Sequence, residues 1–162
     1  PAKSPYLYVN NEAETEKKYY KGFIYTNDLA TWDKNQFVTI IGRKDDMIIS
    51  SGENIYPTEV EAVLNTHAKV KDCIVTSVPD KIRGQIVTAY IVPVASIEEA
   101  EHGLAEELDE FCKESNEIAN FKRPRYYRFV SQIPFNATGK KLHVKIKEIA
   151  SRDQKNGLLY RV

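Results

Sequence analysis

The chain has 162 residues, enough for one domain or for one domain with part of another. Hydrophobic residues make up 42% and charged residues 28%, which is typical of an ordinary globular protein. The formal net charge is zero, so overall charge gives no attraction to nucleic acid or to anionic lipid. No apolar run approaches the ~20 residues that span a bilayer, and the N-terminus lacks a signal-peptide pattern. We therefore expect a cytoplasmic protein.

The cysteines and histidines show no spacing typical of metal ligands. Cys73 falls in a predicted strand and Cys112 in a predicted helix, where small buried hydrophobic residues are expected rather than a disulfide. His67, His102 and His143 are scattered along the chain and are interpreted as structural or surface residues. The sequence therefore predicts no metal site.

Residues 1–44 contain short apolar runs that cannot close a hydrophobic core alone. The runs are Tyr6–Val9, Gly22–Tyr25 and Phe37–Ile41. The polar segment Asp33–Gln36 has the composition of a turn, and it predicts a hairpin between Leu29–Trp32 and Phe37–Ile41.

A charged turn, Gly42–Asp46, joins Phe37–Ile41 to a second predicted strand, Met47–Ser50. The loop Ser51-Gly52 follows, and Gly52 has no Cβ to obstruct a thin ligand passing close to the backbone. Thr58 and Glu61 then have the spacing of a capping box, which predicts the start of a helix.

The rest of the chain predicts alternating strands and helices. Val70–Val78 and Gln85–Val94 are β-branched runs separated by a turn, so we expect them to pair. A third strand is predicted at Tyr126–Val130. Apolar residues at helical spacing predict two further helices. The first helix has Leu104, Leu108, Phe111 and Cys112 at this spacing, and the last has Leu142, Ile146 and Ile149. The expected fold is a small α+β domain, a three-stranded sheet with flanking helices plus a two-stranded hairpin.

Basic segments near the C-terminus are the expected place for an anionic ligand, because 98–117 is acidic whereas 122–128 and 140–147 are basic. In the loop after Ala119, an adenine ring can stack on Phe121 and a guanidinium such as Arg123 can bind a phosphate through two hydrogen bonds. Composition alone favours a plain basic surface loop over this binding site.

Two further motifs allow both a structural and a functional interpretation. Asp28 follows a short strand, where its carboxylate can either form a turn or accept hydrogen bonds from two vicinal hydroxyls. Lys140 and Lys141 come just before the last helix, where the helix dipole disfavours cations by ~0.3–1 kcal/mol. A locally unfavourable choice hints at function, although most lysine pairs simply point into solvent.

Four motifs, in this order, resemble those of the acyl- and aryl-CoA synthetases of the adenylate-forming superfamily. They are Tyr25–Asp28, Ile41–Pro57, Phe121–Pro124 and Asn136–Lys140. The resemblance extends from about Asn10 to Ala150. It implies that residues 1–44 are the end of a large N-terminal AMP-binding domain, that 45–150 form a mobile C-terminal domain, and that 151–162 are a tail.

The resemblance also implies roles for single residues. Lys140 matches the catalytic lysine, Asp28 and Arg43 the contacts to the nucleotide, and Asp45 the hinge on which the small domain turns. A group of five residues matches the CoA site: Ser51, Gly52, Arg83, Phe121 and Arg123. Two positions depart from the family, which usually has glycine where this chain has Asn27 and Ser51.

The implied activity joins a carboxylic acid to CoA through an acyl-adenylate, with ATP and CoA as substrates and AMP as a product. Mg²⁺ is expected through the large domain, which is also the expected partner of this fragment; the fragment alone is expected to be inactive. An adenylating enzyme with a carrier-protein acceptor is one alternative. A non-catalytic module that binds CoA or a nucleotide is the other.

Overall fold

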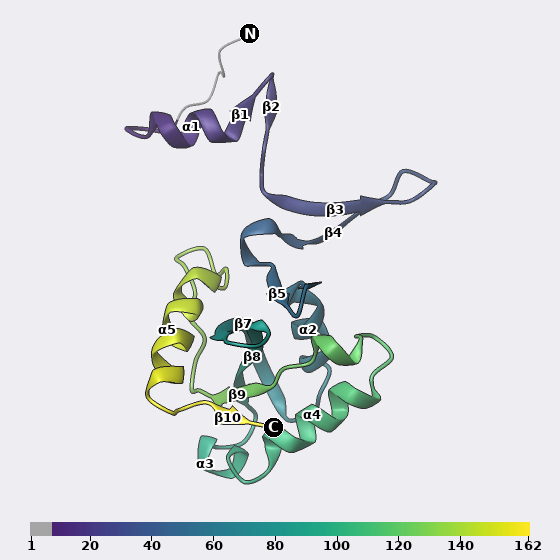
Figure 1. Cartoon of the computed structure of the whole chain (residues 1–162), viewed down its shortest axis with the longest axis vertical. Helices are drawn as coiled ribbons and strands as arrows, with labels where there is room; N and C mark the ends of the chain where they lie inside the picture. Colours follow the sequence, from purple (N-terminus) through teal and green to yellow (C-terminus); the bar gives the residue numbers. More distant parts are fainter. Residues whose placement is uncertain (1–7) are drawn as a thin grey trace. The chain divides into compact units, whose positions relative to one another are not determined.

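The computed structural model describes residues 8–162, which form two compact units that are described separately (Figure 1). The first unit ends at Asp45 and the second is Asp46–Val162. Within residues 8–162, no helix has both the length and the apolar character needed to span a bilayer.

The first unit consists of one short helix and two hairpins. The helix α1 is Glu12–Lys18, and the strands are β1 Tyr19–Tyr20, β2 Phe23–Ile24, β3 Asp28–Trp32 and β4 Val38–Arg43. Strand β1 pairs with β2, and β3 pairs with β4 around the Asp33 turn, which confirms the predicted hairpin. The run Tyr6–Val9 lies partly outside the described residues, and its described part is not a strand.

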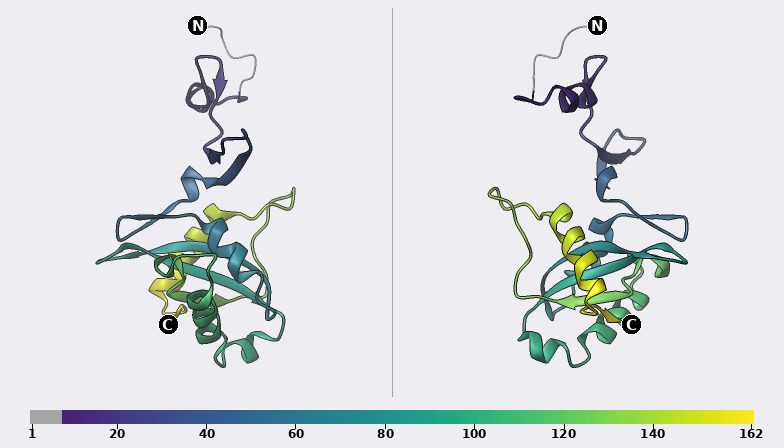
Figure 2. Two further views of the ribbon diagram at one scale, coloured as in Figure 1. Left: turned by 90° about the vertical axis from the view of Figure 1, so that its right-hand side faces the viewer. Right: turned by 60° about the vertical axis from the view of Figure 1, so that its left-hand side comes forward.

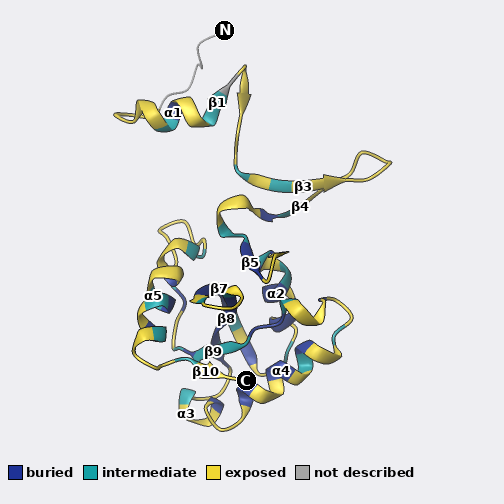
Figure 3. Cartoon of the chain, viewed as in Figure 1, coloured by how far each residue is buried: buried dark blue, intermediate teal, exposed yellow. Residues whose placement is uncertain are grey.

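Large apolar side chains of this first unit are exposed, as the yellow colouring of its hairpins shows in Figure 3. They include Val9, Phe23, Trp32, Phe37, Val38 and Ile40. Helix α1 was not predicted, because it has no apolar face and is held by its cap: Asn11 accepts a hydrogen bond from the Glu14 amide at 3.1 Å. The described part of this unit has no apolar core of its own.

The second unit is built on one mixed sheet with the strand order β10-β9-β8-β7. These strands are β7 Val70–Asp80, β8 Gly84–Pro93, β9 Tyr126–Phe129 and β10 Tyr160–Arg161. Strands β7 and β8 pair, as predicted, in antiparallel orientation, and β9 joins β8 in parallel. Strand β10 was not predicted. It pairs with β9 and makes the sheet four-stranded.

Helices cover both faces of this sheet (Figure 2). They are α2 Pro57–Leu64, α3 Ile97–Ala100, α4 Leu104–Glu114 and α5 His143–Lys155. Cys73 and Val75 of β7 belong to the core cluster with α2 and α4, whereas Ile74 and Val78 belong to the cluster with α5. Because successive side chains of a strand point to opposite faces, β7 and β8 are buried on both sides and read as continuous apolar runs.

The segment 151–162 is part of this unit rather than a tail, which corrects the predicted boundary. Helix α5 continues to Lys155, Ala150 is fully buried, and β10 joins the sheet. The sequence gives little sign of this, since a two-residue strand is too short to show a pattern.

The charged turn Gly42–Asp46 does not join two strands that pair with each other. Strand β5, Ile48–Ser50, pairs with β6, Glu53–Ile55, while Lys44–Asp46 form a 3₁₀ turn. Ser51 and Gly52 have φ values of +53° and +85°, the geometry of a tight two-residue hairpin turn.

The predicted capping box is absent. Tyr56 is the N-cap of α2, without a side-chain cap, and Pro57 occupies the first turn. Glu61 is buried instead and accepts a hydrogen bond from the Val75 amide at 2.8 Å. The Glu61 carboxylate, which the pattern assigned to the helix cap, thus accepts a hydrogen bond from a buried backbone N–H of β7 instead.

Candidate functional site

Lys140 lies on a turn that Asn136 organises. The Asn136 Oδ1 atom accepts hydrogen bonds from the amide of Thr138 at 3.0 Å and from that of Lys140 at 2.9 Å. The Asn136 amide donates in turn to the Lys140 carbonyl at 2.9 Å, and Gly139 supplies the φ of +79° that the turn requires. The turn presents an exposed ammonium group on a fixed backbone.

The two adjacent lysines have different environments. The Lys140 side chain is exposed and makes no hydrogen bond or ion pair with any described residue. Lys141, in contrast, donates to Asp72 Oδ1 at 2.7 Å and to the Cys73 carbonyl at 2.5 Å. Both lysines precede α5, which begins at His143, rather than lying in its first turn. Of the two, Lys140 is the one available to a ligand.

In the first unit, Arg43 joins the residues predicted to contact the nucleotide and to form the hinge. Its Nη1 lies 3.1 Å from Asp28 Oδ1, and its Nη2 lies 3.4 Å from Asp45 Oδ2. The Asn27 side chain donates to the same Asp45 oxygen at 2.9 Å, and Asn27 has a φ of +65°. Asparagine therefore adopts a positive φ at the position where the resemblance leads one to expect glycine, and it adds a hydrogen bond to Asp45.

These contacts hold the pKa of the Asp45 carboxyl below its ordinary value. The Asn27 hydrogen bond is the largest cause; burial opposes it, and the charge of Arg43 adds to the lowering. Asp45 and Arg43 also line a groove of about 630 Å³, together with Lys17 and Lys18. Two further cations, Lys17 and Lys18, thus line the same groove as Arg43.

Three of the residues predicted for CoA meet at one edge of the second unit. The Ser51 amide donates to the Arg83 carbonyl at 2.9 Å, which attaches the Ser51-Gly52 turn to the loop between β7 and β8. A Cβ added at Gly52 would have no atom within 4 Å, so space stays open beside that residue. The Asp80 carboxylate shapes the Arg83 loop by accepting hydrogen bonds from the Ile82 and Arg83 amides.

Arg123, the predicted phosphate contact, is bound to other residues of the protein. Arg123 is only 8% exposed, its Nη1 pairs with Asp109 of α4, and its Nε donates to Asn120 at 2.7 Å. Lys122 is also engaged, with Glu59 of α2 at 2.5 Å. Phe121, the predicted stacking residue, is 46% exposed. Arg123 therefore ties its loop to α4 rather than reaching into solvent.

Arg125 is the cation that the sequence analysis missed. It makes no ion pair with any described residue, and its buried Nε atom has no hydrogen-bond partner there. Burial, and then the positive charge of Arg83, lower the pKa of the Arg125 guanidinium. Of the three cations in Phe121–Arg125, Arg125 alone directly precedes strand β9, Tyr126–Phe129, and its amide donates to the Val87 carbonyl of buried β8 at 2.9 Å.

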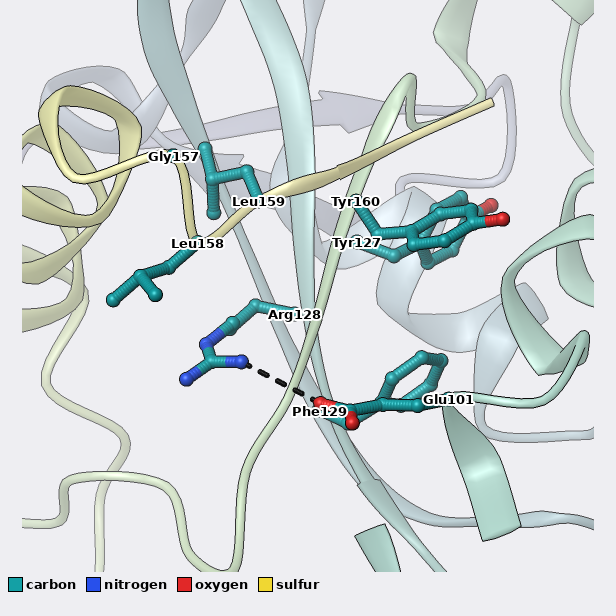
Figure 4. Close-up of a pocket in the computed structure, with 8 residues that line it drawn as sticks. All are labelled: Glu101, Tyr127, Arg128, Phe129, Gly157, Leu158, Leu159 and Tyr160. Atoms are coloured by element: carbon teal, nitrogen blue, oxygen red, sulfur yellow. Dashed lines mark ion pairs between the residues drawn. The ribbon is translucent and has the colours of Figure 1, made fainter. Parts of the chain in front are cut away.

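A further hollow, of about 310 Å³, lies beneath the C-terminal segment and involves none of the predicted site residues (Figure 4). Arg128 and Glu101 form an ion pair of 3.8 Å at its wall, and the remaining lining is largely apolar. Over residues 8–162 there is no group of three or more His, Cys, Asp or Glu that could hold a metal ion.

Comparisons of both sequence and structure with known proteins find similarity to CoA ligases. The chain is 40% identical over 139 residues to 2-succinylbenzoate–CoA ligase of Bacillus licheniformis, covering 86% of this chain and 27% of the ligase. It is 39% identical over 141 residues to a mitochondrial medium-chain acyl-CoA ligase of Macaca fascicularis, covering 87% and 21%.

Among solved structures, the chain is similar to the o-succinylbenzoate CoA synthetase of Bacillus subtilis in complex with its acyl-adenylate intermediate. The TM-score is 0.75 at 36% identity, over 85% of this chain and 27% of that one. The chain thus spans only 21–27% of the length of these relatives. The model of the AMP-binding enzyme C-terminal domain matches residues 59–140, half of the chain, and the chain belongs to this family of C-terminal domains of adenylate-forming enzymes.

Proposed function

We propose that this chain is the C-terminal part of an ATP-dependent acyl-CoA synthetase, which adenylates a carboxylic acid and then transfers the acyl group to CoA. Its relatives are named as CoA ligases, and the matching part makes up 27% and 21% of their lengths. The family resemblance implies that the acyl pocket belongs to the large N-terminal domain, so the acid stays open.

Lys140 is the residue that we propose for the adenylation step. Negative charge develops around the α-phosphate of ATP when the carboxylate attacks and pyrophosphate leaves. An ammonium group on a fixed turn stabilises that charge better than water does, because it needs no reorganisation when the reaction occurs. The single observation that carries this proposal is the contrast between the unpaired Lys140 and the engaged Lys141 on the Asn136 turn.

Asp28 and Arg43 are proposed to hold the nucleotide. Their mutual ion pair of 3.1 Å keeps the Asp28 carboxylate oriented, with one oxygen left to accept hydrogen bonds from ribose hydroxyls. For CoA, we propose Ser51 and Gly52 beside the pantetheine arm. Phe121 would stack on the adenine, and Arg83 with Arg125 would meet the phosphates in place of the engaged Arg123.

The test is the full-length protein that carries this chain, with Lys140→Ala compared with Lys147→Ala. Lys147 is an exposed lysine of α5, seven residues along the chain, and serves as the matched control. For Lys140→Ala, pyrophosphate release from ATP and acid should slow, because its activation free energy rises by ~3 kcal/mol or more. For Lys147→Ala the rate should stay unchanged. Thioester formation from supplied acyl-adenylate should survive in both variants.

If Lys140→Ala adenylates at the normal rate, the proposed role of this lysine is wrong. A full-length protein that adenylates but uses no CoA would favour the carrier-protein alternative. A protein that binds CoA but turns over neither substrate would favour the non-catalytic module. The cytoplasmic location stays a prediction, because one of the relatives is named mitochondrial.

A further inference from the structure

Hydrogen bonds inside the Lys140 turn fix its shape but not its position on the domain. Phe135 and Lys141 form an isolated antiparallel bridge, and the Leu142 amide donates to the Pro134 carbonyl at 2.9 Å. Asn136 completes the tip. All these bonds join one part of 134–142 to another. Buried Ile133 and Ile146 anchor the chain on either side, so the span between them needs its own attachment.

Lys141 supplies that attachment. Its ammonium group reaches Asp72 Oδ1 at 2.7 Å and the Cys73 carbonyl at 2.5 Å, and its side chain is 24% exposed. In the part of the chain that the structure describes, these are the hydrogen bonds that join residues 134–142 to the sheet. One cation thus ties the turn to β7.

The receiving end on β7 is shaped for this contact. The pairing of β7 with β8 shifts between Val70 and Asp72, an irregularity of the kind that redirects side chains at the end of a strand. The Asp72 carboxylate also accepts a hydrogen bond from the Cys73 amide at 2.8 Å. Because its own backbone holds it, Asp72 presents an oriented acceptor to Lys141.

Neighbouring side chains of an extended segment point in opposite directions, so holding Lys141 against the sheet directs Lys140 away from it. We propose that Lys141 is a positioning residue for adenylation: its contact with Asp72 and Cys73 fixes where the Lys140 ammonium group meets the α-phosphate. This inference rests on the proposed function of Lys140. A misplacement of about 1 Å can cost roughly 100-fold in rate, so the attachment matters for catalysis as well as for folding.

The experiment uses the full-length protein and the variant Lys141→Met, which keeps the length of the side chain without its charge. The kcat of pyrophosphate release should fall roughly 10- to 100-fold, with the KM values for ATP and acid within about threefold of the wild type. Thioester formation from supplied acyl-adenylate should change less than about twofold. A merely structural role would lower both half-reactions together.

Three further variants sharpen the result. Lys141→Arg should recover most of the adenylation rate, because a guanidinium can also pair with Asp72. Lys147→Met, which removes an exposed lysine of α5, should adenylate normally. Asp72→Asn should lower the kcat of adenylation, and the double variant Asp72→Asn/Lys141→Met should be no slower than Lys141→Met alone, because both changes break one contact.

A normal adenylation rate in Lys141→Met, with Lys140→Ala inactive, would overturn the positioning role while leaving the proposed function intact. If Lys140→Ala itself adenylates normally, the proposed function fails instead. Should Lys141→Met not fold, Asp72→Asn decides the question: a folded Asp72→Asn protein with a normal adenylation rate also overturns the inference.

Discussion

At the scale of single residues, the buried Glu61 carboxylate shows how one polar side chain joins three elements. It lies on α2, accepts the Val75 amide of β7, and has its Oε1 atom 3.8 Å from His143 Nε2 at the start of α5. Burial raises the pKa of Glu61 above its ordinary value, although the Val75 hydrogen bond and the charges of His143 and Lys141 oppose the rise. The charged form is therefore less favourable in the folded protein than in the unfolded chain.

This pKa predicts a pH-dependent effect of Glu61→Gln. A carboxyl group with a raised pKa in the folded state favours folding below its unfolded pKa, and that contribution is lost as the pH rises through the folded pKa. Glutamine stays neutral and can still accept the Val75 hydrogen bond. We expect Glu61→Gln to melt at a higher temperature than the wild type at about pH 7.5, with the difference disappearing near about pH 4.

Thermal melts across that pH range check the prediction, with Glu148→Gln as the control. Glu148 is an exposed residue of α5, and its variant should show no pH-dependent difference from the wild type. A Glu61→Gln protein that is less stable than the wild type at about pH 7.5 would mean that the His143 and Lys141 charges outweigh burial.

At the scale of elements, long apolar patterns were predictable and short or tertiary features were not. Strands β7 and β8 are continuous apolar runs and α4 has apolar residues at helical spacing, and each pattern is long enough to recognise. Strand β10 has two residues, and α1 depends on one asparagine cap and on its charges. Neither can be read from hydrophobic periodicity, because neither buries an apolar stripe.

The same limit explains the candidate site. The motif around Lys140 is local, since Asn136, Gly139 and Lys140 organise one turn by themselves. Which of several nearby cations stays available depends on partners far away in the sequence. Asp109 forms an ion pair with Arg123, and Asp72 forms one with Lys141. The spacing of residues along the chain does not show which of them lie close together in the folded protein.

The loop between α4 and β9 gives a prediction at this scale. Arg123→Ala leaves Asp109, which is 6% exposed, with Lys113 at 3.2 Å as its one remaining ion-pair partner among the described residues, so we expect a loss of stability of about 3 kcal/mol. Arg125→Ala breaks no ion pair with the described residues. It should lower the affinity for CoA while leaving the melting temperature nearly unchanged.

Calorimetry with CoA and with dephospho-CoA, combined with thermal melts of the full-length protein, separates the two arginines. Arg83→Ala, which removes the other cation proposed to meet the phosphates, is measured in the same way. If Arg123→Ala melts like the wild type but loses CoA binding, Arg123 is the phosphate contact after all, and the ion pair with Asp109 contributes little.

At the scale of the whole molecule, the division of the chain at Asp45 is the feature with the most consequence for function. One compact unit ends at Asp45 and the other begins at Asp46, within the 3₁₀ turn Lys44–Asp46. Next to this division, the Asp45 carboxylate is held by Asn27 and Arg43 of its own unit. A change in one or two backbone torsions there would reorient everything that follows, including Lys140 and the Arg83 loop.

The hinge prediction compares Asp45→Pro with Asp45→Asn in the full-length protein. Proline fixes φ near −65° and also restricts Lys44, so it should trap one arrangement of the domains, whereas asparagine removes only the charge that Arg43 contacts. We expect Asp45→Pro to form acyl-adenylate from ATP and acid but to transfer it to CoA slower by orders of magnitude. Asp45→Asn should perform both half-reactions, because its backbone can still rotate.

Rapid-quench measurement of each half-reaction distinguishes these outcomes, provided that the melting temperature of each variant stays near that of the wild type. Equal rates for Asp45→Pro and the wild type in both half-reactions would make Asp45 an ordinary turn residue, and the two steps would then have to share one arrangement of the domains.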